Sequence, residues 1–85
     1  MDYALEYSEE SVAQLERTDR AQARRIIRKL ESILSDPLHS FERLSGRPEY
    51  KLRVGDYRII ANIDEQKRKV FVRSLGHRKN VYKRH

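Results

Sequence analysis

The stretch YKLRVGDYRIIANI, residues 50–63, decides the fold. Apolar and polar side chains alternate on both sides of Gly55-Asp56, a pair suited to a two-residue hairpin turn. We therefore predict a hairpin of strands 50–54 and 57–63, with Gly55 and Asp56 as its loop. In this register one face is apolar, while the other places Arg53 opposite Arg58 with Lys51 diagonal to Arg58.

The opposed cations do not stabilise this hairpin, because like charges directly opposite each other weaken a sheet. A surface that binds phosphate groups would explain them. The alternative is that long cationic side chains spread apart and cover an exposed sheet face, which also discourages aggregation. If the following strand keeps the alternation, Arg73 lies beside Arg58 as well.

The segments around the hairpin complete an α+β pattern. Tyr3, Leu5 and Tyr7 indicate a first strand. Ser8 caps a helix that runs to about Arg17, with Val12 and Leu15 facing inward. We then predict a second helix over 20–35, which Asp36-Pro37 ends, and a loop over 38–49. The last strand is predicted over 70–75.

The resulting order is β-α-α-β-β-β. We expect two N-terminal helices packed on one face of a small, mainly antiparallel four-stranded sheet. With 85 residues, the chain fits one domain spanning 1–85.

Composition narrows the protein class further. Cysteine is absent, so the disulfide framework typical of small secreted domains is excluded. The first residues lack a basic and apolar leader, and no apolar run approaches the roughly 20 residues of a membrane helix. We expect a cytoplasmic protein without membrane association.

Charge is divided unevenly along the chain, whose formal net charge is +6. Residues 1–46 carry seven basic and nine acidic side chains, whereas residues 47–85 carry twelve basic and four acidic ones. Such a cationic half favours a polyanionic partner, although a net charge of this size also serves solubility.

The segment GHRKNVY, residues 76–82, follows the last strand. His77, Arg78 and Tyr82 provide an imidazole, a fixed cation and a phenol, which are groups suited to phosphodiester chemistry. A surface or packing role for His77 and a core role for Tyr82 are the alternatives. No carboxylate follows Glu65, so nothing local would hold Mg²⁺ or Mn²⁺, and we expect no metal and no cofactor.

The hairpin motif YKLRVGDYRI followed one strand later by GHRKNVY resembles the RelE/ParE toxin superfamily, specifically its RelE-like branch of mRNA interferases. The similarity spans nearly the whole chain. It implies the toxin of a type II toxin-antitoxin system, a metal-independent endoribonuclease that cleaves translated mRNA in the decoding site of the ribosome. It also implies a cognate antitoxin protein as partner.

The resemblance assigns candidate site residues. Catalytic roles fall on Arg58, Arg78, Lys51 and Tyr82, and RNA binding on Arg53, Arg73, His77 and Lys79. The sequence departs from the best-known RelE pattern at Arg53 and His77, where that pattern has lysine. Arginine binds phosphate but does not readily release a proton, so Arg53 cannot replace a lysine in proton transfer.

The implied reaction is attack of the RNA 2′-hydroxyl on the adjacent phosphorus, which leaves a 2′,3′-cyclic phosphate and a 5′-hydroxyl. We expect Arg58 to stabilise the phosphorane, Arg78 to hold the leaving group, and Lys51 or Tyr82 to act as base. Two other functions stay open: a ParE-like toxin that binds DNA gyrase without nuclease activity, and a non-catalytic RNA-binding module.

Overall fold

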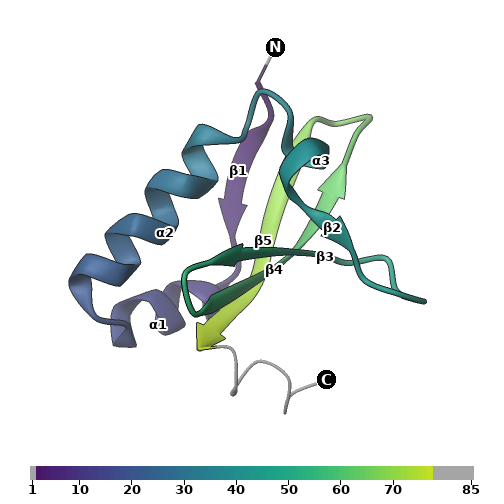
Figure 1. The fold of residues 1–85 in the computed structure, drawn as a ribbon. Helices are drawn as coiled ribbons and strands as arrows, with labels where there is room; N and C mark the ends of the chain where they lie inside the picture. The colour runs from purple at the N-terminus through teal and green to yellow at the C-terminus, as the bar shows by residue number, and fades with distance from the viewer. Residues whose placement is uncertain (1, 78–85) are drawn as a thin grey trace.

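The computed structural model describes residues 2–77. Strand β1 (Ala4–Tyr7) leads into helices α1 (Glu9–Arg17) and α2 (Arg20–Ser32). A short helix α3 (Pro37–Ser40) and a two-residue strand β2 (Glu42–Arg43) follow. Strands β3 (Tyr50–Val54), β4 (Tyr57–Asp64) and β5 (Lys69–His77) complete the described chain (Figure 1).

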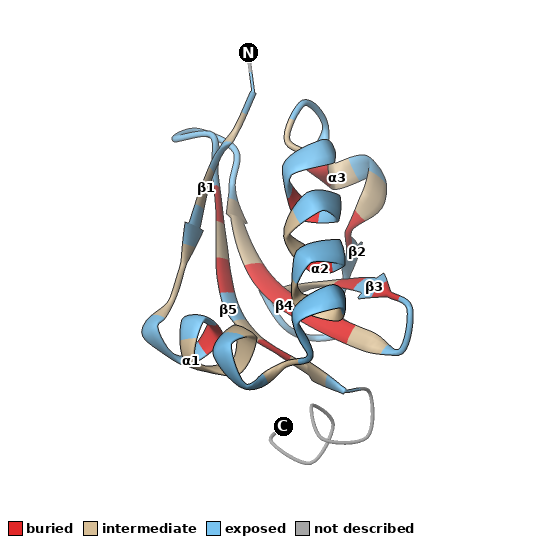
Figure 2. Cartoon of the chain, turned by 90° about the vertical axis from the view of Figure 1, so that its left-hand side faces the viewer, coloured by how far each residue is buried: buried red, intermediate tan, exposed pale blue. Residues whose placement is uncertain are grey.

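The strands form one mixed sheet in the order β1-β5-β4-β3-β2. β1 runs parallel to β5, and the other neighbours are antiparallel. Helices α1 and α2 lie on one face of this sheet (Figures 1 and 2). The α+β class and the two helices on one face are confirmed, while the sheet has five strands and not the four that the sequence predicts.

The additional strand, β2, and all of α3 except Pro37 lie in the segment 38–49, which the sequence predicts to be a loop. Pro37 begins α3, where the fixed φ of proline suits the first helical position. Phe41 ends the turn with its N–H donating to the Pro37 carbonyl, and its side chain is buried. Both elements are too short to leave a periodic pattern in the sequence.

The core fills the space between the helices and the inner face of the sheet. In Figure 2 the buried positions follow the sides of α2, β4 and β5 that face each other. The buried core cluster consists of Ile26, Leu30, Ile33, Phe41, Leu52, Val54, Ile59, Ala61, Val70, Val72 and Leu75. Since burial of one such side chain contributes about 1.5–3 kcal/mol, this cluster fixes which face of each strand turns inward.

Helix α2 ends at Ser32, three residues before the predicted Ser35. The Ser32 hydroxyl donates to the carbonyl of Lys29, which competes with continued helix. The Leu34 carbonyl accepts the N–H of Tyr3 at the start of β1, so it serves the sheet and not a longer helix.

Helix α1 packs on β5 by a different side from the predicted one. The sequence predicts that Val12 faces inward, but it is 43% exposed, and Ser11 is buried in its place. The Ser11 hydroxyl is satisfied by the Ser8 carbonyl, so its burial leaves no orphan donor. Leu15, on the same side of the helix as Ser11, packs against the core as predicted.

Side chains of α1 complete the backbone hydrogen bonds of β5 where β1 stops. β1 pairs with β5 only as far as Tyr7 opposite Val72. Beyond this point the Ser8 hydroxyl donates to the Arg73 carbonyl at 2.6 Å, and the Leu75 N–H donates to Gln14 Oε1 at 2.6 Å. Helix α1 therefore substitutes for a longer β1 along this edge.

Candidate functional site

The hairpin of β3 and β4 has the register that the sequence predicts. Arg53 lies opposite Arg58, Lys51 opposite Ile60, and Val54 opposite Tyr57. Gly55 has a φ of 58°, and the following Asp56 does not have positive φ, a pattern that fits a type II′ hairpin turn. The two-residue turn therefore fixes the alternation on both strands.

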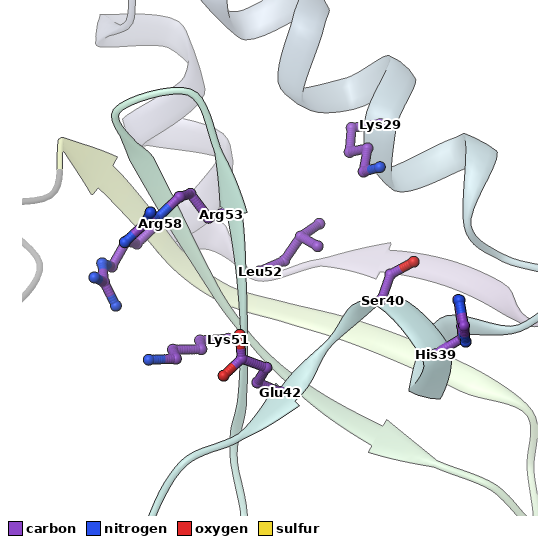
Figure 3. Close-up of a pocket in the computed structure, with 8 residues that line it drawn as sticks. All are labelled: Lys29, His39, Ser40, Glu42, Lys51, Leu52, Arg53 and Arg58. Atoms are coloured by element: carbon purple, nitrogen blue, oxygen red, sulfur yellow. The ribbon is translucent and has the colours of Figure 1, made fainter.

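The core determines which side chains of the hairpin reach the outer face. Leu52, Val54 and Ile59 belong to the buried cluster beneath the helices. Because successive side chains of a strand point to opposite faces, the intervening residues turn away from the helices. Figure 3 shows Lys51 and Arg58 projecting to the same side of the hairpin, away from α2.

The three cations of the outer face, Lys51, Arg53 and Arg58, form what we term the cationic face. Arg58 is only 7% exposed, Lys51 is half-buried, and Arg53 is exposed. Directly opposed like charges destabilise a sheet, and a buried charge loses hydration. Stability alone therefore does not explain their placement.

The cationic face opens into a groove of about 620 Å³ (Figure 3). Its described lining residues are Lys29, His39, Ser40, Glu42, Lys51, Leu52, Arg53 and Arg58. Leu52 and Arg53 point to opposite faces of β3, and both line the groove. The groove therefore crosses the edge of β3 from the cationic face towards α2 and α3.

Four of these lining residues were missed by sequence reasoning. Glu42 lies opposite Lys51 in the pairing of β2 with β3, but a two-residue strand gives no signal. His39 and Ser40 belong to α3, which is equally short. Lys29 belongs to the charged side of α2, and its position directly before the buried Leu30 could have placed it at the edge of the apolar stripe.

Arg73 does not lie beside Arg58, and this prediction was wrong. Arg58 pairs with Gly76, and the register shifts between Ile60 and Ala61, so Arg73 is the extra residue of a β-bulge on β5. Its guanidinium donates to Asn62 Oδ1 at 3.0 Å. A bulge of this kind cannot be read from alternation alone.

His77 is separated from the cationic face by the sheet. It pairs with Tyr57, which packs against the core on the helix side. The two rings meet edge to face, with centroids 5.9 Å apart and an interplanar angle of 73°. The predicted Arg78, Lys79 and Tyr82 lie outside the described residues.

Among residues 2–77, no group of three or more His, Asp or Glu side chains is placed to hold a metal ion. No helix within the same range has the length and apolar character needed to cross a membrane.

Comparisons with known proteins place the chain in a family. The family model described as the ParE toxin of the type II toxin-antitoxin system parDE matches residues 5–82. A search of curated protein sequences found no significant match.

Solved structures match in fold. A mutant of the E. coli toxin RelE in the free state is 25% identical, with a TM-score of 0.80 over 98% of this chain and 93% of that one. The isolated E. coli RelE toxin is 26% identical, with a TM-score of 0.76 over 96% of this chain and 93% of that one.

The RelBE2 toxin-antitoxin complex of Mycobacterium tuberculosis includes a chain with a TM-score of 0.82 at 17% identity, over 92% of this chain and 100% of that one. The family match over most of the sequence and these folds agree with the resemblance found from the hairpin motif. The chain belongs to the ParE toxin family of type II toxin-antitoxin systems, within the RelE/ParE superfamily, and its fold is RelE-like.

Proposed function

We propose that this toxin is a ribosome-dependent mRNA endonuclease of the RelE type. The observation that carries the proposal is the cationic face, where Arg58 is held almost fully buried beside Arg53 and close to Lys51. The similarity to E. coli RelE at 25–26% identity supports the same conclusion. A protein that needed only the fold would gain nothing from opposing these cations.

The cationic face suits a phosphodiester that gains charge during reaction. Attack of the 2′-hydroxyl forms a phosphorane with additional negative charge, and preorganised donors stabilise such a centre better than water does. Arg58 offers a guanidinium whose orientation is restricted by burial, and Arg53 adds a second one across the hairpin. These two arginines would bind the scissile phosphate.

Proton transfer requires other groups. Neither arginine can act as a base, so we assign removal of the 2′ proton to Lys51 or Tyr82. Arg78 would hold the leaving 5′ oxygen, which takes a proton from solvent water to become the 5′-hydroxyl. Glu42 lies opposite Lys51 on the neighbouring strand and lines the same groove. The reaction as proposed uses no metal and no cofactor.

We propose two partners for the toxin. Solved complexes pair RelE with the antitoxin RelB, so a cognate antitoxin is expected here too, as an acidic chain that covers the cationic face. The second partner is the ribosome with mRNA in its decoding site. Alignment of the message there would supply orientation that the isolated protein lacks, a contribution that can reach several kcal/mol.

The test is cleavage of mRNA by purified toxin with and without programmed ribosomes. We expect rapid cleavage on ribosomes and little cleavage of free RNA, with 2′,3′-cyclic phosphate and 5′-hydroxyl ends. Equal cleavage in both conditions would remove the ribosome from the proposal. RNA binding without any cleavage product would favour a non-catalytic RNA-binding module.

DNA gyrase is a second candidate target because the matching family model carries the parDE description. A supercoiling assay with purified gyrase separates the two functions. The nuclease proposal predicts unchanged supercoiling at toxin concentrations that stop translation. Inhibition of gyrase together with intact mRNA would establish the alternative.

A further inference from the structure

The groove has a second end, on the helix side of β3, that the proposed cleavage reaction does not use. Lys29 of α2 and His39 and Ser40 of α3 line this end. In Figure 3 the side chain of Lys29 extends from α2 towards Ser40, while Lys51 and Arg58 lie on the other side of the hairpin. The groove thus has cationic groups at both ends.

The edge of β3 between these ends is open. β2 pairs with β3 only at Tyr50 and Lys51, so within residues 2–77 no strand covers this edge from Leu52 to Val54. An extended chain that lies on the cationic face can therefore pass over the edge towards α2. β2 blocks such a path only on the Tyr50 side of the groove.

The helix-side end carries donors for an anion. Lys29 and His39 are exposed, and neither forms an ion pair with any described residue. A lysine ammonium has three donors and no acceptor, a histidine ring has at least one N–H, and serine adds a hydroxyl. Glu42, the one carboxylate among the described lining residues, pairs with β3 at Lys51 and not at this end.

Helix α2 packs against the hairpin through Ile26 and Leu30, which share the buried core with Leu52. The guanidinium of Arg25 lies over the turn, and a Cβ atom on Gly55 would come within 3.0 Å of Arg25 Nη1. Arg25 and Lys29 are four residues apart, so they share one side of α2. Because Leu30 is fully buried in the core, the neighbouring Lys29 has a fixed place beside β3.

We propose that Lys29, with His39 and Ser40, forms a second phosphate-binding subsite for the nucleotide next to the scissile bond. The inference rests on the proposed function, because it takes RNA as the ligand of the cationic face. RNA that places its scissile phosphate on Arg58 and Arg53 crosses the edge of β3 and places a neighbouring phosphate at Lys29.

The test measures binding of two short RNA probes to the purified full chain. The probes are 2′-O-methyl oligouridylates with one and with two internal phosphates, which resist cleavage because the attacking hydroxyl is blocked. Wild type should bind the two-phosphate probe about tenfold more tightly, the gain expected from one charge-assisted contact. Lys29→Gln should remove this gain and leave binding of the one-phosphate probe unchanged.

The controls separate a subsite from a general loss of charge. Lys67→Gln removes the same charge from the exposed turn between β4 and β5 and should preserve the gain. Lys29→Arg should restore it. With the two-phosphate probe, the slope of log binding constant against log salt should fall by about 0.7 in Lys29→Gln, the value for one phosphate contact on a single strand.

Three results would overturn the subsite: wild type gains nothing from the second phosphate, Lys29→Gln keeps the gain, or Lys67→Gln loses it equally. Cleavage on ribosomes is measured separately. If wild type cleaves mRNA on ribosomes but Lys29→Gln still binds the two-phosphate probe more tightly, the subsite is refuted and the nuclease proposal is not. If Lys29→Gln loses the tighter binding but wild type cleaves no mRNA, the nuclease proposal is refuted instead.

Discussion

Arg58 is the residue on which the proposed chemistry depends. It is 7% exposed and lies opposite Arg53, so the folded chain holds two guanidinium groups together and largely dehydrates one of them. Its removal relieves the repulsion from Arg53 but also ends the interactions that Arg58 makes in the fold. Cleavage should therefore respond to this position more strongly than stability does.

Arg58→Met is expected to lower the rate of cleavage on ribosomes by at least about 100-fold, the usual effect of removing one preorganised donor from a charged transition state. The variant should remain folded, as measured by denaturant titration. Arg43→Met, which removes an exposed arginine of β2, is the matched control and should keep most activity. If the Arg58→Met variant cleaves like wild type, Arg58 has no part in the reaction.

Tyr7 has a buried hydroxyl without a hydrogen-bond partner among the described residues. Burial, and to a smaller extent the nearby charge of Glu31, raises the pKa of this phenol above its ordinary value of 10.0. The unfolded chain ionises Tyr7 first as pH rises, so the folded state loses stability above about pH 10. Below that pH both states carry the neutral phenol, and this residue adds no pH dependence.

Tyr7→Phe should therefore flatten the decline of unfolding free energy above about pH 10. At neutral pH it should raise this free energy by up to about 1 kcal/mol, because an unsatisfied buried hydroxyl is removed. Denaturant titrations at pH values on both sides of the phenol's ordinary pKa measure both effects. A loss of more than about 1 kcal/mol at neutral pH would show that the hydroxyl stabilises the fold.

At the scale of elements, the β3–β4 hairpin is the most predictable part of the molecule. Its alternation and its Gly55-Asp56 turn are both local signals, and they determine the strand bounds and the pairing of Arg53 with Arg58. Lys51, Arg53 and Arg58 are therefore brought together as predicted.

What the sequence did not predict depends on contacts between distant elements. The bulge that moves Arg73 lies where the Ser8 hydroxyl donates to the Arg73 carbonyl, and no property of residues 70–77 alone predicts it. Lys29 and His39 reach the groove only because α2 and α3 pack beside β3. The prediction that Val12 faces inward was also wrong, because Ser11 takes the buried position and carries no hydrophobic signal, whereas Leu15 packs against the core as predicted.

The turn of the hairpin offers a test at the same scale. Gly55 and Gly46 both have positive φ, at 58° and 70°, so alanine at either position strains the backbone by about 1–2 kcal/mol. Only at Gly55 would the new Cβ also meet Arg25, at 3.0 Å, whereas the space around Gly46 is empty to 4 Å.

Gly55→Ala should thus lower the free energy of unfolding more than Gly46→Ala, in denaturant titrations of both variants. The excess loss should shrink in an Arg25→Ala background, where the clash is absent. Equal losses at the two glycines in both backgrounds would show that Arg25 does not brace the hairpin.

At the scale of the whole molecule, the positive charge of the C-terminal half contributes to the sheet face that the helices leave uncovered. The last 39 residues contain twelve of the nineteen basic side chains. The sheet presents three of these on the face that the helices leave uncovered, next to an open strand edge. This arrangement offers the surface for an anionic chain that the proposed function requires.

The most direct measurement is to map the 5′ ends of transcripts after the toxin acts on translating ribosomes. The account predicts new 5′-hydroxyl ends within the codons that occupy the decoding site, and their absence with Arg58→Met. Ends spread along ribosome-free RNA, or translation that stops while transcripts remain whole, would contradict it.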